Sequence, residues 1–284
     1  MNLPFFLARR FVAAETLENT LPVASQLREQ GLFTTLDLLG EYISERKLAE
    51  QARDSYLEML RVLGKQNGID RNISIKLSML GQKIDESFCL DNLHQVLSLA
   101  KETDTFVRLD MEGSDVTSST VGILERVHPL YPENVGIVLQ AYLKRTREDV
   151  ERVCEIGARV RLCKGAYKEP AAIAWQDMSQ IRDHYLEYMD VLMQRGKYPA
   201  IATHDDILIS AAKRYVSENA IATDIFEFQM LYGIRTDTQK EMIADGFNMR
   251  VYIPYGSMWY PYFSRRLRER KENVWFILKH MFVR

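Results

Sequence analysis

Short apolar runs and amphipathic segments alternate along this chain of 284 residues. The apolar runs are rich in β-branched and aromatic residues, whereas apolar residues return every three to four positions in segments such as 86–102 and 178–195. This alternation predicts an α/β protein with a parallel sheet, and eight such units predict closure into a (βα)8 barrel of the TIM type. The predicted strands are 32–39, 73–80, 106–112, 135–142, 158–165, 200–205, 224–230 and 249–256.

The chain shows no low-complexity linker and no break in composition that would mark a second large domain. Residues 1–31 precede the first predicted strand and are expected to form an N-terminal helical arm. Residues 32–284 are expected to form the barrel, with a C-terminal helix beyond Asn273.

The charge balance limits the classes of partner. The chain has 37 Lys plus Arg and 39 Asp plus Glu, a formal net charge of −2, and 46% apolar residues. This composition is typical of a soluble globular protein, and it argues against a dedicated nucleic-acid binder, which would carry a basic excess.

Targeting signals and cysteine usage indicate the compartment. The first residues lack the pattern of a secretory signal, and three cysteines without CxxC spacing suit a reducing compartment, so a cytoplasmic location is expected. The ends of the chain, 3–11 and 274–284, are amphipathic. They would fit either packing against the body of the protein or contact with a membrane surface.

Polar side chains gather where the predicted strands end, which is where barrels of this class place their active sites. Each one alone would fit a hydrogen-bonded layer inside the barrel, but burying so many polar groups without a ligand would be costly. The residues are Lys76, Asp110, Glu112, Gln140, Arg161, Lys164, Thr203, His204, Asp205, Glu227, Gln229 and Tyr252.

Several common catalytic signatures are missing. The sequence contains no GxGxxG, GxxxxGK[ST], HExxH or GxSxG pattern. With five histidines and no pair of them at ligand spacing, no metal site is expected.

The strand-end chemistry is cationic, and a second cationic group follows the last strand. In "YPYFSRRLRERKEN", residues 260–273, helical spacing puts Tyr262, Arg265, Arg266 and Glu269 on one face. Because a guanidinium fork binds a carboxylate through two hydrogen bonds, this face predicts a small carboxylate ligand with an apolar body.

The segments "SIKLSML", "RLDME", "VLQAYLKRT", "VRLCKGAY", "ATHD", "FEFQMLYG", "RVYIPYG" and "YPYFSRRLRER" occur in this order. Because it carries these segments in this order, the chain resembles the proline dehydrogenase family in its short monofunctional bacterial form. The resemblance extends from about Leu32 to Asn273. The resemblance implies a distorted (βα)8 barrel with non-covalent FAD and oxidation of L-proline to Δ1-pyrroline-5-carboxylate by hydride transfer to flavin N5. It further implies a membrane quinone as electron acceptor, a peripheral position on the inner face of the cell membrane, and a separate pyrroline-5-carboxylate dehydrogenase downstream.

The resemblance also implies two sets of site residues. Arg265 and Arg266 would clamp the proline carboxylate together with Lys76, and Asp110 and Glu269 would brace these cations. The proline ring would be enclosed by Tyr252, Tyr262 and Leu231. FAD would be bound by Gln140 and Arg161 at the isoalloxazine and otherwise by Cys163 (through its main chain), Lys164, Gly165, Tyr167, Thr203, His204 and Gln229, with Glu227 in support. Lys168 departs from the aromatic residue that larger members of the family often carry at this position.

Two other readings fit parts of the pattern. A Schiff-base lyase or aldolase would use Lys76 or Lys164 as nucleophile. A binding protein without enzymatic activity would use the basic face 265–270 for phosphate or a partner, with steep salt dependence.

Overall fold

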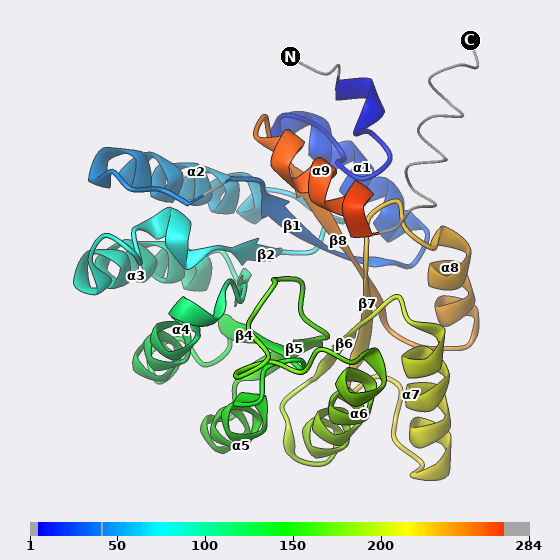
Figure 1. Ribbon diagram of the computed structural model, residues 1–284. Helices are drawn as coiled ribbons and strands as arrows, with labels where there is room; N and C mark the ends of the chain where they lie inside the picture. The colour runs from blue at the N-terminus through cyan, green and yellow to red at the C-terminus, as the bar shows by residue number, and fades with distance from the viewer. Residues whose placement is uncertain (1–4, 41, 270–284) are drawn as a thin grey trace.

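In a computed structural model of the protein, eight parallel strands pair in the order β1 to β8 and close into a barrel (Figure 1). The structure describes residues 5–40 and 42–269, and for Leu7 and residues 265–269 it describes the backbone alone. The strands are β1 (Phe33–Leu38), β2 (Asn72–Ile75), β3 (Phe106–Leu109), β4 (Val135–Gln140), β5 (Arg159–Cys163), β6 (Ala200–Ala202), β7 (Glu227–Leu231) and β8 (Met249–Tyr255). The predicted barrel is thereby confirmed.

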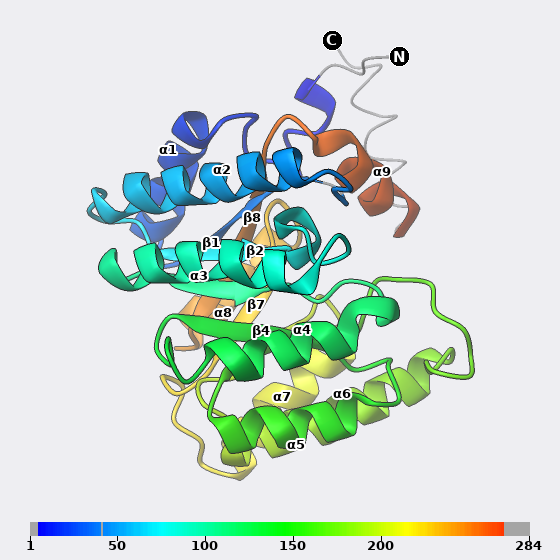
Figure 2. The ribbon, with the colours of Figure 1, turned by 90° about the vertical axis from the view of Figure 1, so that its left-hand side faces the viewer.

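The helices lie outside the strands, as Figure 2 shows for α2 to α6. The helices are α1 (Leu17–Glu29), α2 (Arg46–Gly64), α3 (Glu86–Glu102), α4 (Ser114–Val127), α5 (Thr146–Ile156), α6 (Met178–Arg195), α7 (Asp206–Glu218), α8 (Thr236–Ala244) and α9 (Trp259–Glu269). Several begin at an aspartate that accepts a hydrogen bond from the first turn: Asp85 accepts from Phe88 N, and Asp177 accepts from Ser179 N. These caps explain why the two helices start where the sequence pattern changes.

Strand β1 closes the barrel against β8 over a register that runs from Phe33 opposite Arg250 to Leu38 opposite Tyr255. The strands are buried on both faces, since the helices cover the outside and side chains fill the interior. Among the polar residues within the strands, Gln140, Arg161, Gln229 and Tyr252 line the cavity at the C-terminal end of the barrel.

The second predicted strand was too long. Strand β2 ends at Ile75, and residues Leu77–Leu80 form a 3-10 turn, η2, that ends at Gly81 with a φ of 95°. Lys76, between the two, directs its side chain to Asp37 on β1. The strand prediction failed because the apolar pattern continues through the turn.

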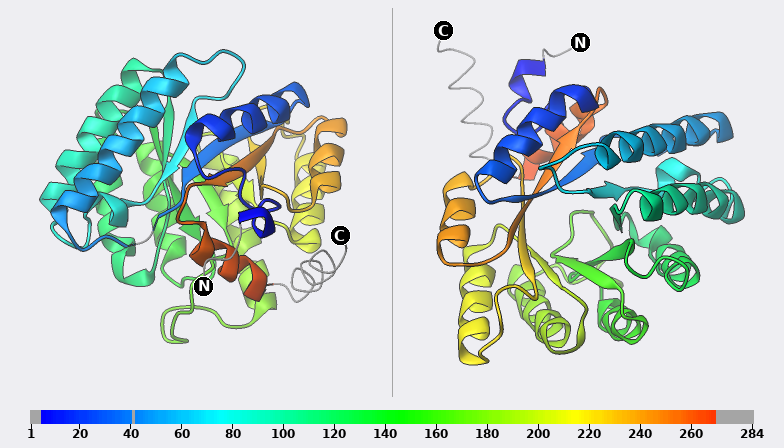
Figure 3. Two further views of the ribbon diagram at one scale, coloured as in Figure 1. Left: turned by 90° about the horizontal axis from the view of Figure 1, so that it is seen from above. Right: turned by 180° about the vertical axis from the view of Figure 1, so that it is seen from behind.

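The segment before α1 is only partly helical. It contains the 3-10 turn η1 (Phe5–Leu7), and the stretch from Ala13 to Ala14 then runs beside β8, where Ala13 N donates to Pro254 O at 3.0 Å. The ring of Phe5 meets that of Trp259 edge to face at 5.8 Å, so η1 lies beside α9 (Figure 3). The division of the chain at residue 31 stays a prediction.

Candidate active site

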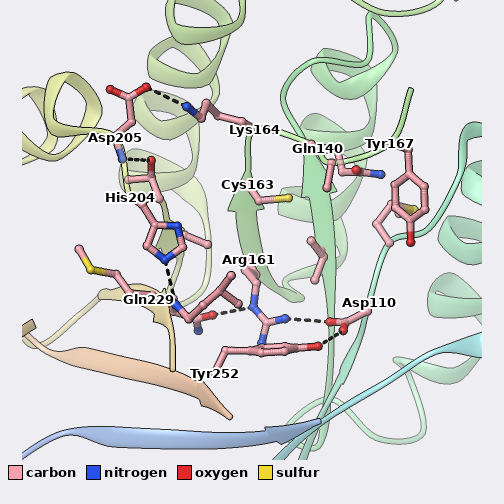
Figure 4. Close-up of a pocket in the computed structure, with 18 of the residues that line it drawn as sticks. Asp110, Gln140, Arg161, Cys163, Lys164, Tyr167, His204, Asp205, Gln229 and Tyr252 are labelled. Carbon is pink, nitrogen blue, oxygen red and sulfur yellow. Dashed lines mark hydrogen bonds and ion pairs between the residues drawn. The ribbon is translucent and has the colours of Figure 1, made fainter. Parts of the chain in front are cut away.

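A cavity of about 630 Å³ opens at the C-terminal ends of the strands (Figure 4). Its volume lies in the range of cofactor and substrate sites, roughly 300–1,000 Å³. Most residues predicted from the sequence line it: Lys76, Asp110, Gln140, Arg161, Cys163, Lys164, Gly165, Tyr167, Thr203, His204, Gln229, Leu231, Tyr252 and Tyr262. The fold therefore brings together side chains from seven strand ends and from α9.

Arg161 on β5 forms the floor of the cavity, with a side chain that is 7% exposed. Its Nε donates to Gln229 Oε1 at 2.6 Å, and its two terminal nitrogens donate to Asp110 Oδ1 at 2.8 Å and to Ser74 Oγ at 3.0 Å. The guanidinium also lies over the ring of Tyr252, 5.0 Å from its centroid. Arg161 thus ties β2, β3, β5, β7 and β8 together, and three of its five N–H groups serve protein acceptors.

A second chain of polar contacts runs along one side of the cavity. The Tyr252 hydroxyl donates to Asp110 Oδ2 at 2.7 Å, Lys76 Nζ lies 3.9 Å from the same oxygen, and Lys76 Nζ donates to Asp37 Oδ1 at 2.6 Å. Burial alone would lower the pKa of Lys76, but the two carboxylates outweigh it and leave this pKa raised. The lysine is therefore held as a cation.

Asp37 was missed by the sequence reasoning, although it is the nearer carboxylate to Lys76. Its side chain is 1% exposed, and it lies within β1 among apolar residues. A charged residue inside an apolar strand is costly to bury without a partner, and this was the available signal.

The opposite end of the cavity carries two more cations around one carboxylate. Lys164 Nζ and Arg182 Nε donate to Asp205 Oδ2 at 2.8 and 2.9 Å. Partial burial alone would raise the pKa of Asp205, but these hydrogen bonds outweigh it and lower the pKa to about 2. Arg182, on α6, was not predicted, because its position in a helical pattern is that of an ordinary solvated residue.

The depressed pKa of Asp205 predicts a pH-dependent contribution to stability. A folded-state pKa of about 2 lies below the ordinary value of about 3.9, so this contribution is present above about pH 4 and is lost as pH falls toward 2. We expect Asp205→Asn, which retains an oxygen to cap α7, to be less stable than the parent at pH 7 and to approach it near pH 3. Urea unfolding at pH 7, 5, 4 and 3 measures this, and a difference that stays constant with pH would contradict the assignment.

The two residues after β6 are held by main-chain groups. His204 Nε2 accepts from Leu231 N at 3.0 Å, which leaves the proton of the neutral ring on Nδ1. Thr203 Oγ1 accepts from Asp205 N at 3.1 Å. These bonds fix the wall of the cavity between β6 and β7.

A second chamber of about 440 Å³ adjoins the first. Both are lined by Lys76, Glu112, Tyr167, Tyr252 and Tyr262. Leu39, Met258 and Pro261 add an apolar wall. The second chamber therefore combines a cation with aromatic and apolar surface, as a small apolar carboxylate would require.

Glu112, which follows β3, lies where the two chambers meet and links three segments of the chain. Its carboxylate accepts from Ser78 N at 3.2 Å and from Ser78 Oγ at 2.7 Å, and its carbonyl accepts from Gln140 Nε2 at 2.8 Å. It thus ties the turn after β2 to the ends of β3 and β4.

Glu227 does not line the cavity but lies deeper in the barrel. Its carboxylate accepts from Arg250 Nε at 2.8 and 3.0 Å, and it also accepts from the side-chain amide of Gln229. Because Gln229 in turn accepts from Arg161, Glu227 supports the floor of the cavity from below.

The predicted carboxylate clamp cannot be placed atom by atom. Arg265, Arg266 and Glu269 belong to α9, but their side chains lie outside the part of the chain that is described. Tyr262, one turn earlier on α9, is buried and lines both chambers. Among the described residues, no group of three or more His, Cys, Asp or Glu is placed to hold a metal ion.

The cysteine in the cavity wall is poorly suited to nucleophilic chemistry. Burial raises the pKa of the Cys163 thiol to about 12, so the thiol stays protonated at neutral pH. Its Sγ lies 3.6 Å from the carbonyl of Leu139.

Comparison with known proteins gives a consistent result. The family model described as proline dehydrogenase matches residues 20–279. Proline dehydrogenase 1 of Bacillus subtilis is 39% identical over 272 residues, which cover 96% of this chain and 89% of the relative. Proline dehydrogenase of Deinococcus radiodurans is 39% identical over 281 residues, which cover 97% and 90%.

A solved structure agrees in fold. Proline utilization A from Bdellovibrio bacteriovorus, inactivated by N-propargylglycine, superposes with a TM-score of 0.86 at 27% identity over 93% of this chain. This chain spans 32% of that longer protein. By the family match and by its identity to full-length relatives, the chain belongs to the proline dehydrogenase family of oxidoreductases.

Proposed function

We propose that this protein oxidises L-proline to Δ1-pyrroline-5-carboxylate, the first step of proline catabolism, with FAD as its cofactor. The observation that carries the proposal is the two-chamber cavity, in which Lys164 and Arg182 line the larger chamber alone, whereas Lys76 lines both chambers. One group suits a phosphate-bearing cofactor and the other suits a small carboxylate.

The residues of the larger chamber fit FAD. Lys164 and Arg182, which share the carboxylate of Asp205, supply the cations that a diphosphate needs. Arg161 and Gln140 supply donors for the polar edge of a flavin ring. When bound, FAD supplies the N5 atom that accepts a hydride from the substrate.

Gly165 gives the segment after β5 the conformation that this chamber requires. Its φ is 116°, and a Cβ there would lie 2.2 Å from the ring of Tyr142. Only glycine lets the segment lie against that ring, which keeps the main chain close to the cavity.

The smaller chamber is proposed to hold proline. Lys76, with Arg265 and Arg266 by motif position, would bind the carboxylate. Tyr252 and Tyr262, which line both chambers, and Leu231, which lines the larger one, would surround the ring. Their contribution is orientation, because the ring carbon beside the nitrogen must be held at reacting distance from its acceptor. A protonated amine cannot release this hydride, so the rate of flavin reduction should rise with pH, and a flat profile would count against the mechanism.

The electrons are proposed to pass to a membrane quinone at a peripheral contact, with a separate enzyme oxidising the product onward. None of the helices in residues 5–40 and 42–269 is long and apolar enough to cross a bilayer. In the segment 3–11, Ala8 and Phe11 are buried in a cluster with Trp259 and Phe263, so the amphipathic segment 274–284, which lies outside the described chain, is the proposed contact. Loss of co-sedimentation with vesicles on removing 274–284 would support this, and unchanged binding would exclude that segment.

The geometry weighs against a Schiff-base mechanism. A lysine nucleophile must be neutral, but Lys76 is held between two carboxylates and Lys164 is paired with Asp205. Borohydride trapping in the presence of substrate would test this alternative directly.

The visible spectrum of the purified protein tests the proposal. We expect an oxidised-flavin spectrum that bleaches on anaerobic addition of L-proline and returns with a soluble quinone. D-proline and glutamate are the controls and should leave the spectrum unchanged. A protein that stays colourless after FAD is supplied would overturn the proposal.

A further inference from the structure

Glu169 lies outside both chambers, but its carboxylate holds the segment 165–169, which contributes to the lining of both. Glu169 follows β5 by six residues, in the connection to α6, and its side chain is half-buried. Its Oε1 accepts from Ser114 N at 2.8 Å, and its Oε2 accepts from Ser114 Oγ at 2.6 Å. Both carboxylate oxygens are therefore engaged by one residue at the start of α4.

Helix α4 is built to receive this carboxylate. Its N-cap residue is Gly113, which has no side chain to accept a hydrogen bond from the first turn. A Cβ on Gly113 would meet Glu169 Oε1 at 3.8 Å, an ordinary contact, so the glycine matters here because it lacks a capping side chain of its own. Glu169 thus serves as the missing cap from 55 residues away, and its negative charge is favoured at a helix N-terminus.

The segment that Glu169 fixes lies directly over the active-site cavity. Gly165, Ala166 and Tyr167 line the larger chamber, and Tyr167 also lines the smaller one. Figure 4 shows Tyr167 on the side of the cavity that carries Gln140 and Asp110. Only Lys168 separates this tyrosine from Glu169.

The rest of the connection is held independently of Glu169. Lys144 N donates to Ile173 O at 3.0 Å, Lys144 Nζ donates to Ala171 O at 2.8 Å, and Trp175 N donates to Tyr142 O at 2.8 Å. The stretch 171–175 therefore stays attached to the turn after β4 when Glu169 is removed. The main chain at Glu169 also accepts from Gln176 Nε2 at 3.1 Å, so the Glu169 side chain supplies the tie of this stretch to α4 but not its whole attachment.

We propose that Glu169 is a positioning residue of the active site, whose bidentate bond to Ser114 holds Tyr167 at the boundary between the two chambers. The functional part of this inference rests on the proposed function, since it assigns the larger chamber to FAD and the smaller one to proline. Without the bond, the main chain at 167–169 loses this tie to the start of α4, and Tyr167 covers the cofactor less closely.

Hydrogen exchange of the flavin-free full chain tests the bond itself. In Glu169→Ala, exchange of the Ser114 amide, which loses its acceptor, should become about 10-fold faster, the loss expected for a charge-assisted bond near the surface. Exchange in 171–175 should be unchanged and is the internal control. Ser114→Ala, which keeps the backbone N–H donor, should give a smaller change.

Binding of FAD to the apoprotein tests the functional part. Glu169→Ala should raise the Kd about 10-fold, whereas Lys144→Met, which cuts another side-chain tie of the same connection, should leave it within about 2-fold. Because Glu169 acts through Tyr167, the double variant Tyr167→Ala with Glu169→Ala should have a Kd for FAD less than about 2-fold above that of Tyr167→Ala alone.

The outcomes separate the two claims. Unchanged exchange of the Ser114 amide would overturn the bond. Additive effects of the Tyr167 and Glu169 substitutions, or equal effects of Lys144→Met and Glu169→Ala, would overturn the positioning role. If the unsubstituted protein binds no FAD, the proposed function fails, and the exchange measurement still decides whether Glu169 fixes the segment.

Discussion

Arg161→Met is expected to lower the rate of proline-dependent flavin reduction by about 10²–10³, the range found when one preorganised donor is removed from an active site. Methionine fills a similar volume but donates no hydrogen bond. The variant therefore leaves Asp110 without its closest cation. Gln229 and Ser74 lose the donor that Arg161 supplies to each of them. Breaking this buried pair should also cost about 3 kcal/mol of folding free energy. Stopped-flow absorbance and urea unfolding measure the two effects.

Arg250→Met is the matched control for the loss of stability. Arg250 Nε donates to both carboxylate oxygens of Glu227, and a terminal nitrogen donates to Thr34 O at 2.7 Å, all within the same barrel, but Arg250 does not line either chamber. We expect a comparable loss of stability with a much smaller effect on the rate. Equal losses of rate in the two variants would show that Arg161 acts only through the fold.

Arg161→Lys keeps the experiment informative if the methionine variant does not fold. Lysine retains the charge beside Asp110 but lacks the planar fork that reaches three acceptors at once. A stable protein with a reduced rate is expected. Full activity in this variant would show that charge alone is required.

Lys76→Met is expected to destabilise the protein by about 3–5 kcal/mol, because it strands a buried carboxylate. Asp37 is 1% exposed and has Lys76 Nζ at 2.6 Å, and burial raises the pKa of Asp37. Lys76 opposes this shift, so the pKa of Asp37 rises further in the variant, whose folded state then binds a proton that the unfolded state releases above about pH 4. The stability gap to the parent should therefore widen as pH rises from about 4 to 7.

The double variant Lys76→Met with Asp37→Asn separates stability from binding. Removing the stranded charge should restore much of the lost stability, since a neutral amide of the same shape is far less costly to bury. Binding of a proline-like carboxylate inhibitor should remain weak in both variants, because the cation is absent from both. If stability does not recover, the stranded charge of Asp37 is not the main cause of the destabilisation in Lys76→Met. Normal inhibitor binding would remove Lys76 from the proposed carboxylate clamp.

Residues adjacent to strands were the easiest to predict. Lys76, Asp110, Gln140 and Lys164 stand at or just after strands, and a barrel brings all such positions to one end whatever its helices do. Asp37 was overlooked because it lies inside its strand rather than after it, and the apolar pattern of the strand predicts only that this position is buried.

Arg182 and Glu169 could not have been found in the same way. Arg182 comes from the interior of α6, and its contact with Asp205 depends on how α6 packs beside the start of α7. Glu169 meets Ser114 across 55 residues, through an irregular connection that no periodicity describes. Neither position carries a local signal that distinguishes it from a solvated surface residue.

The eight-unit barrel follows from the sequence alone, because the period of apolar residues is a local property of the chain. The same is true of the family and of the barrel end at which the polar residues gather, because both rest on short strand-end motifs. The tertiary structure alone decided the pairing within the site. It joined Lys76 to Asp37, Arg161 to Asp110 and Gln229, and Glu169 to Ser114. The physical reason is that a buried charge selects its partner by distance in space, and those distances are fixed only when β1 closes against β8 and the connections pack above them.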